Sequence, residues 1–292
     1  MNKKYELTEE TLYWEGATLH RIKALRNFRN IKAGDLGGWI EKERNLSQEG
    51  DCWVDDNAKV WGNAMIYNHA TACNNTQIWE NARVWGRAEI GGNAKIHNCA
   101  RIYGDTTICE DTEVFGNAQI YNTAIVYGNA KIYDDAVVFD KVIVSGNANI
   151  CGSAAIYGSA LVGDNAEVGG KAQICGNAEI FGDAHVYGGI IEGSARVCGN
   201  ALVNSSSDII WISSFGRYAN TITAFQCADG SFKVNSGLFT GKLEEYEQKI
   251  KNVFAGTPYW KEYSALMELI RSYFEARTFN SSKPLEIEPD II

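Results

Sequence analysis

The sequence predicts a mainly β protein built around a parallel β-helix, and three regularities in its 292 residues predict this fold class. Every sixth residue from Val54 to Val186 is Val or Ile at 22 of 23 positions, with Ala72 as the exception. A small residue, usually Ala, stands two places before most of these positions, and Gly, Asn or Asp commonly stands two places after. A short period kept over so much of the chain predicts a stacked solenoid.

The six-residue unit also predicts how each coil is built. Side chains alternate between the two faces of a strand, so the small and the aliphatic residue both point inward. Gly, Asn and Asp tolerate the backbone angles that a corner needs. Three units close one coil, so the repeat from Val54 to Val203 predicts about eight coils stacked at roughly 4.8 Å. Val186 and Ile191 are only five apart, which predicts one shortened corner near Gly188 and Gly189.

The segments on either side of the repeat are predicted to close its ends. Residues 1–50 are expected to cap the first coil, because an open end would expose unpaired strand edges. The β-helix is placed at 51–203, a small α+β domain at 204–278 and a mobile tail at 279–292, which lacks periodicity. In the α+β domain, strand-like runs at 208–215, 220–227 and 231–239 precede helical patterns at Leu243, Tyr246, Ile250, Val253 and at Tyr259, Tyr263, Leu266, Ile270, Phe274.

Composition excludes several classes of protein. The first ten residues are too charged for a secretory signal and no run of 18 apolar residues occurs, so we expect a cytoplasmic protein with no membrane partner. The eight cysteines are scattered without a Cys-x-x-Cys pair, so neither a metal site nor a disulfide framework is expected. No cofactor is expected either. A net charge of −9 argues against bulk nucleic-acid binding, which needs a clustered positive surface.

The repeat resembles that of the left-handed β-helix, hexapeptide-repeat proteins, and this resemblance implies the handedness. The segments that begin at Leu19, Lys32 and Asn45, and those that begin at Thr221 and Gly237, resemble phage and prophage proteins of this kind. Such proteins are often labelled as transferases. The resemblance thus implies a phage origin and the cytoplasm of the host cell, whereas a fold by itself does not establish chemistry.

Acyl transfer from coenzyme A or an acyl carrier protein is the activity that the resemblance implies first. In that family a histidine acts as general base, and a loop that leaves the coils often builds the pocket. The unbroken register leaves no room here for such a loop. His69 falls at a corner, His97 and His185 point outward about five coils apart, and His20 lies in the cap. We expect these histidines to be solvated. The sequence therefore assigns no catalytic residue and favours a protein that is not an enzyme.

Outward side chains eighteen residues apart stack on one face and predict an assembly. Two of these columns are aromatic, and a third face is small but includes Ile125, Ile143 and Leu161. Apolar surface of this extent usually marks an interface, so we expect a homotrimer around an axis parallel to the coils. The aromatic columns are Tyr67, Trp85, Tyr103, Tyr121, Phe139, Tyr157 and, on the second face, Trp61, Trp79, His97, Phe115, Tyr133.

Arginines beside one aromatic column predict a ligand. An aromatic face can stack a base while guanidinium groups bind phosphate. The sequence therefore predicts that the trimer sequesters a phosphate-bearing small molecule, such as a host nucleotide signal, without turnover. One alternative is an acyl- or acetyltransferase, and a second is a rigid structural or protein-interaction scaffold. The predicted ligand-binding residues are Arg83, Trp85, Arg101, Tyr103 and Arg217.

Overall fold

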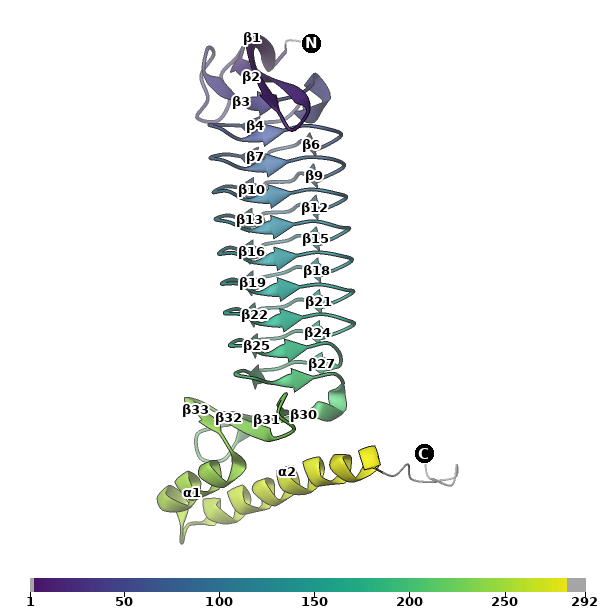
Figure 1. The fold of residues 1–292 in the computed structure, drawn as a ribbon. Helices are drawn as coiled ribbons and strands as arrows, with labels where there is room; N and C mark the ends of the chain where they lie inside the picture. Colours follow the sequence, from purple (N-terminus) through teal and green to yellow (C-terminus); the bar gives the residue numbers. More distant parts are fainter. Residues whose placement is uncertain (1–2, 283–292) are drawn as a thin grey trace, which may run out of the picture.

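The computed structural model describes residues 3–282 as a long solenoid with a cap at its N-terminal end and a sheet-and-helix unit at its C-terminal end (Figure 1). The solenoid is a left-handed β-helix with three parallel sheets as its faces. The predicted fold class is therefore confirmed. Two of the sheets contain nine solenoid strands and the third contains eight, so the solenoid has about nine turns rather than about eight.

Each solenoid strand is two residues long and pairs with the strands one coil before and after it. The first sheet contains β5 (Lys59–Val60), β8 (Gln77–Ile78), β11 (Lys95–Ile96), β14 (Glu113–Val114), β17 (Lys131–Ile132), β20 (Asn149–Ile150), β23 (Glu167–Val168), β26 (His185–Val186) and β29 (Leu202–Val203). The second sheet contains β4 (Trp53–Val54), β7 (Thr71–Ala72), β10 (Glu89–Ile90), β13 (Thr107–Ile108), β16 (Ile125–Val126), β19 (Ile143–Val144), β22 (Leu161–Val162), β25 (Glu179–Ile180) and β28 (Arg196–Val197). The third sheet contains β6 (Met65–Ile66), β9 (Arg83–Val84), β12 (Arg101–Ile102), β15 (Gln119–Ile120), β18 (Val137–Val138), β21 (Ala155–Ile156), β24 (Gln173–Ile174) and β27 (Ile190–Ile191).

The interior of the solenoid is filled by the two inward residues of each unit. The aliphatic residues and the alanines two places before them are almost completely buried. Thr76, Thr106 and Thr112 replace alanine at three of these positions, and each hydroxyl donates to the carbonyl three residues earlier at 2.6–2.7 Å. The predicted short corner is also present, because Ile190 pairs with Gln173, one residue short of a full coil.

Corner residues link one coil to the next. Many have a positive φ, the backbone region that glycine tolerates best. Where the residue is not glycine, its side-chain oxygen often accepts a hydrogen bond from the backbone N–H one coil further on, as Asn98 does from Gly116 at 3.2 Å and Asp164 from Gly182 at 3.0 Å. Asparagine and aspartate at corners thus satisfy backbone donors that glycine leaves to solvent.

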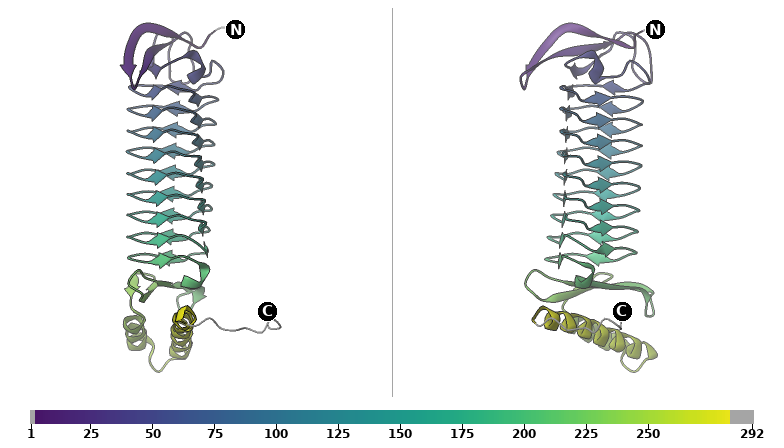
Figure 2. Two further views of the ribbon diagram at one scale, coloured as in Figure 1. Left: turned by 45° about the vertical axis from the view of Figure 1, so that its right-hand side comes forward. Right: turned by 90° about the vertical axis from the view of Figure 1, so that its right-hand side faces the viewer.

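The cap continues the first sheet past the end of the solenoid. Its strands are β1 (Tyr5–Trp14), β2 (Ala17–Ala24) and β3 (Leu36–Ile40), followed by the short helix η1 (Glu43–Asn45), and β3 pairs in parallel with β5. Strands β1 and β2 form an antiparallel hairpin with a two-residue turn at Glu15 and Gly16, both with positive φ. Figure 2 shows this hairpin bending over one side of the first coils.

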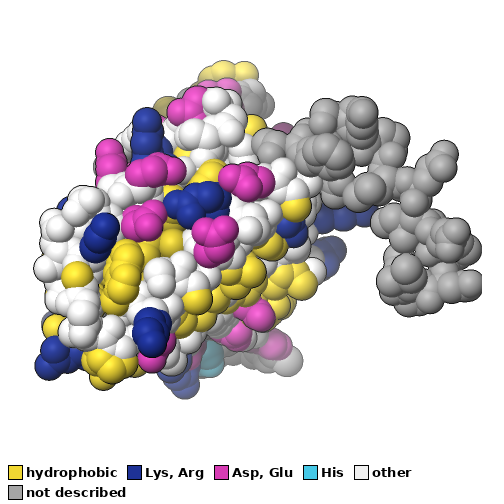
Figure 3. Space-filling model, turned by 90° about the horizontal axis from the view of Figure 1, so that it is seen from below, with side chains coloured by type: hydrophobic (Ala, Val, Ile, Leu, Met, Phe, Trp, Pro, Cys, Tyr) yellow, Lys and Arg dark blue, Asp and Glu magenta, His cyan; other side chains and the backbone are white. Residues whose placement is uncertain are grey.

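The C-terminal unit closes the other end of the solenoid with an antiparallel sheet and two helices. The three predicted strand-like runs and both predicted helices are present, although Val253 is exposed rather than part of the buried helix face. Seen from this end, apolar side chains lie exposed among interspersed acidic and basic ones (Figure 3). The elements are η2 (Ser206–Asp208), β30 (Ile209–Phe215), β31 (Asn220–Gln226), β32 (Phe232–Ser236), β33 (Phe239–Gly241), α1 (Leu243–Phe254) and α2 (Pro258–Ser282).

The division into domains at 1–50, 51–203 and 204–278 stays a prediction. Helix α2 includes the first four residues of the expected tail, and residues 283–292 lie outside the described residues. Within residues 3–282, no helix is long and apolar enough to cross a membrane.

Candidate functional site

Aromatic side chains on two faces of the solenoid stack into continuous ladders. The tyrosine ladder on the third sheet has ring centroids 4.4–5.5 Å apart and planes within 10° of parallel. The tryptophan ladder on the first sheet has centroids 4.2–5.1 Å apart and planes within 9°. The tyrosine ladder is Tyr67, Trp85, Tyr103, Tyr121, Phe139, Tyr157, and the tryptophan ladder is Trp61, Trp79, His97, Phe115, Tyr133.

Four of the five predicted ligand-binding residues lie together on the third sheet. Arg83 and Arg101 are exposed neighbours on β9 and β12, and Trp85 and Tyr103 follow them in the tyrosine ladder. Trp85 is stacked between Tyr67 and Tyr103, so both of its faces are covered. A base would have to displace a neighbouring ring in order to stack on Trp85, which offers it only a ring edge.

The fifth predicted residue lies elsewhere. Arg217 is in the turn between β30 and β31, in the C-terminal unit, with its guanidinium 5.7 Å from the ring centroid of Tyr218. The five residues therefore do not form one site, and their role in binding a ligand stays a prediction.

The tryptophan ladder contains a histidine that is paired with a carboxylate. His97 is stacked between Trp79, at 4.2 Å, and Phe115, at 5.1 Å, and its side chain is only 15% exposed. Its Nε2 lies 3.3 Å from Oε1 of Glu113, one coil further on. The other oxygen of Glu113 lies 3.3 Å from the Lys131 ammonium. The expectation of a solvated histidine is wrong for His97, because the flanking rings and Glu113 cover most of its surface.

A hollow of about 420 Å³ opens beside this histidine. Its volume is in the range of about 300–1,000 Å³ that is usual for small-molecule sites. We call it the His97 hollow. One wall is Glu15, at the tip of the β1–β2 hairpin, and the floor is the outward face of β8 and β11. The lining residues are Glu15, Trp61, Gln77, Trp79, Lys95, His97 and Glu113.

Apolar contacts hold the hairpin against the solenoid. Leu19 of β2, Trp39 of β3 and Trp61 form a small buried cluster, and Trp14 packs against it next to the hairpin turn. The Lys59 ammonium lies 4.5 Å from the ring centroid of Trp14, and burial lowers the pKa of this lysine. The tip is therefore anchored by the residues on both of its strands.

Two opposite charges line the hollow without pairing. Neither the Glu15 carboxylate nor the Lys95 ammonium forms an ion pair with another residue that the structure describes. Lys95 of β11 stands two places before His97, so both side chains point outward on the same face of the solenoid. The hollow thus combines an imidazole, a free carboxylate and a free ammonium.

The other histidines have different surroundings. On the same sheet, His185 lies 3.3 Å from Glu167 and 3.2 Å from the Tyr187 hydroxyl, but its side chain is 40% exposed. His69, at a corner, is 51% exposed and lies 3.5 Å from Asp51. His20 is held in the cap by the Thr8 carbonyl at 3.3 Å. None of these three lines the His97 hollow.

Tyr133, the last ring of the tryptophan ladder, is a poor base. Burial, together with a hydrogen bond from its hydroxyl to Cys151, raises the pKa of Tyr133 to about 12. Its phenol is therefore protonated near neutral pH. Among residues 3–282, no group of three or more His, Cys, Asp or Glu side chains is placed to hold a metal ion.

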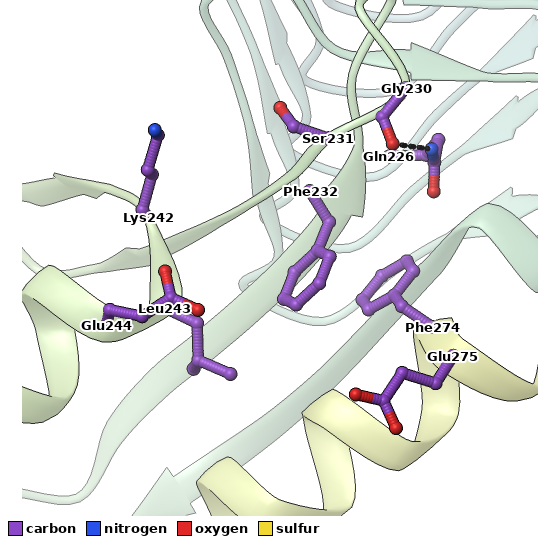
Figure 4. Close-up of a pocket in the computed structure, with 9 residues that line it drawn as sticks. All are labelled: Gln226, Gly230, Ser231, Phe232, Lys242, Leu243, Glu244, Phe274 and Glu275. Atoms are coloured by element: carbon purple, nitrogen blue, oxygen red, sulfur yellow. Dashed lines mark hydrogen bonds between the residues drawn. The ribbon is translucent and has the colours of Figure 1, made fainter. Parts of the chain in front are cut away.

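A second hollow lies in the C-terminal unit between the sheet and α2 (Figure 4). Phe232 stacks on Phe274 there, with centroids 4.6 Å apart, and Gln226 donates to the Gly230 carbonyl at 3.0 Å. Its volume is about 330 Å³, and its lining includes carboxylates and Lys242 but no imidazole or thiol. The His97 hollow is therefore the stronger candidate for chemistry that needs a base near neutral pH.

Comparison with known proteins gives one family model and one curated relative. Residues 172–188 match the YdcK beta-solenoid repeat. The Escherichia coli (strain K12) protein named "Uncharacterized acetyltransferase YdcK" is 37% identical over 86 residues. Over that stretch, this chain is similar to YdcK. The match covers 26% of this chain and 26% of YdcK.

A solved structure from Bacillus cereus, described as a candidate acetyltransferase, is also similar. It is 17% identical and the alignment covers 72% of this chain and 91% of that one, with a TM-score of 0.18.

The comparisons correct the functional prediction. The sequence favoured a protein that sequesters a nucleotide without turnover, whereas the YdcK match points to the acyl- or acetyltransferase alternative. The prediction that a base stacks on Trp85 overlooked the tyrosine ladder, in which Tyr67 and Tyr103 already cover both faces of that ring.

The wall that the cap hairpin gives to the His97 hollow was also not predicted from the sequence. The unbroken register predicts that no loop leaves the coils, and the cap hairpin supplies a wall without any such loop. The available signal was the Trp14-Glu15-Gly16-Ala17 stretch between two strand-like segments. It was weak, because glutamate is not among the residues that favour a two-residue turn with positive φ.

Proposed function

We propose that this protein is an acyltransferase of the hexapeptide-repeat class, and that His97 is its general base. The observation that carries the proposal is the His97–Glu113 pair, which lies in a hollow between the solenoid and the cap hairpin. The name of the relative YdcK supports the same reaction class.

In this proposal, each ring nitrogen of His97 has a separate role. Glu113 accepts a hydrogen bond from Nε2–H, which fixes the tautomer and leaves a lone pair on Nδ1. Nδ1 then takes the proton from the acceptor hydroxyl or amine while that oxygen or nitrogen attacks the thioester carbonyl. The carbon–sulfur bond breaks, and the imidazolium returns the proton to the leaving thiolate.

Lys95 supplies positive charge beside the base. Its free ammonium is available to the phosphates of a coenzyme A thioester, or to the oxyanion that develops during attack. Gln77 and the ring edges of Trp61 and Trp79 complete a lining that can exclude part of the solvent around the reacting groups.

Assembly and origin belong to the same proposal. We expect the protein to act as a homotrimer in the cytoplasm, and the resemblance to phage and prophage proteins implies that a phage encodes it. Apolar residues exposed on the second sheet support a trimer, with Ile125 at 39% and Leu161 at 40% exposure.

The test is release of free thiol from acetyl-coenzyme A in the presence of a panel of hydroxyl and amine acceptors. Replacing the base with a residue of similar size, His97→Asn, should lower kcat by about 100-fold or more, because general-base catalysis typically contributes about 10²–10⁴-fold. His185→Asn is the matched control, since His185 lies on the same sheet and is also paired with a glutamate. Its turnover should stay near that of the wild type.

Two results would contradict the proposal. One is a wild-type protein that consumes no acyl donor with any acceptor in the panel. The other is full turnover by the His97→Asn variant, provided that circular dichroism shows the variant to be folded.

A further inference from the structure

The cap hairpin brings the Glu15 carboxylate to the wall of the His97 hollow, where it pairs with no residue that the structure describes. We propose that Glu15 selects an acceptor that carries a protonated amine, in addition to the hydroxyl or amine that is acylated. The inference rests on the proposed function, because it names the substrate class of the same site.

Glu15 is the carboxylate of the hollow that remains free. Glu113 also lines the hollow, but its two oxygens face His97 and Lys131, each at 3.3 Å. The Glu15 carboxylate has neither a hydrogen bond nor an ion pair with any residue that the structure describes. A ligand ammonium placed there would gain a charge-assisted hydrogen bond, which is roughly twice as strong as a neutral one.

The position of Glu15 is fixed by the fold. It occupies the first place of a two-residue turn with φ of 45°, next to Gly16 with φ of 80°. Trp14 anchors that turn to the cluster of Leu19, Trp39 and Trp61. The carboxylate is thus carried by a braced hairpin, so less conformational entropy is lost when it binds a ligand.

The rings of the hollow cannot supply the same selectivity. A cation is attracted to the face of an aromatic ring. The faces of Trp79 are covered by Trp61 and His97, and Trp61 is itself buried in a cluster with Leu19 and Trp39. Lys95 repels a cation. Preference for an amine therefore depends on Glu15, and a single substitution can test it.

Two groups that line the hollow define the acceptor. Glu15 needs a protonated amine, and His97 needs a nucleophilic hydroxyl or amine. Amino alcohols, amino sugars and diamines meet both requirements, whereas simple sugars and diols meet only the second.

The experiment measures binding without an acyl donor, so that it does not depend on turnover. Three amines are titrated beside their hydroxyl counterparts: glucosamine and glucose, ethanolamine and ethylene glycol, putrescine and butanediol. Binding is followed by ligand-observed NMR, with His97→Asn as a check that the ligand contacts the hollow. The wild type should bind at least one amine about tenfold more tightly than its counterpart.

Two variants decide the role of Glu15. Glu15→Gln should remove the preference for the amine and leave the affinity for the hydroxyl counterpart unchanged. Glu10→Gln, an equal change of charge on the exposed part of β1, should keep the preference. The inference is overturned if no amine binds in preference to its counterpart, or if the preference survives in Glu15→Gln. Loss of turnover in His97→Asn with no preference for amines would retain the proposed function and reject this inference alone.

Discussion

At the scale of single residues, the candidate site depends on how one carboxylate orients one imidazole. In the proposed mechanism, Glu113 lies 3.3 Å from Nε2 of His97 and accepts the Nε2–H, which leaves Nδ1 without a proton. Lys131 holds the other oxygen of Glu113 at the same distance, which limits rotation of the carboxylate. In the proposed mechanism, the pair is therefore oriented before a substrate binds.

This orientation predicts the effect of an isosteric change. In Glu113→Gln, the new amide can donate to Nε2, so the imidazole would carry its proton on Nδ1 and lose its basic nitrogen there. We expect kcat to fall by about 100-fold with little change in fold, as for other dyads in which the tautomer is disturbed. Stopped-flow measurement of thiol release would show it.

The control for this prediction is Glu89→Gln. Glu89 is an exposed carboxylate on β10 of the second sheet, away from the hollow. A variant Glu113→Gln that turns over as fast as Glu89→Gln would show that Glu113 does not orient the base.

At the scale of elements, the corner is the part of each coil that accepts the fewest types of residue. Gly104 has φ of 82°, and a Cβ built on it would lie 2.7 Å from the backbone N and O of Asn122. Other corners accept a larger residue because its oxygen binds the next coil, as Asn98 does with Gly116. A side chain at a corner is thus tolerated when it offers an acceptor.

This difference predicts an unusual order of stabilities. Gly104→Ala should lower the free energy of unfolding by about 1–3 kcal/mol, because the methyl group crowds the next coil and offers no hydrogen bond. Gly104→Asn should lower it by less, although asparagine is larger, since its amide oxygen can accept from the Asn122 N–H. Urea unfolding followed by circular dichroism would compare them. An alanine variant as stable as the asparagine variant would contradict this account of the corners.

At the scale of the whole molecule, the solenoid is a straight prism whose second face is apolar at its middle. Ile125 and Leu161 are exposed there, and Ile143 lies between them in the same sheet. Exposed apolar surface on a regular face favours closed cyclic assembly, in which each copy covers part of its neighbour.

We therefore predict a particle of three chains of 32.2 kDa each. The double substitution Ile125→Glu and Leu161→Glu should convert it to monomers without changing the circular dichroism spectrum, because both side chains point outward. Analytical ultracentrifugation measures both masses. A wild-type protein that sediments as a monomer at micromolar concentration, or a trimer that survives the double substitution, would refute the trimer or its proposed interface respectively.

The sequence by itself determined the solenoid. A period of six, with Val or Ile inward and Gly, Asn or Asp at corners, is a local pattern. Because every unit repeats this pattern, all units predict the same stacked β-helix. The sequence also predicted the shortened corner at Gly188 and Gly189, as well as the strands and helices after Val203. Turn residues and apolar periodicity can be recognised within a few neighbouring residues.

Only the tertiary structure decided the site. Glu15 and His97 are far apart in the sequence, and nothing local to either residue shows that the hairpin bends over the first coils. Stacking likewise covers the ring faces of Trp85 that the sequence had offered to a ligand. Repetition specifies a scaffold through contacts that recur in every coil, whereas the hollow arises from contacts between the cap and the solenoid that occur once in the chain, which no repeated pattern encodes.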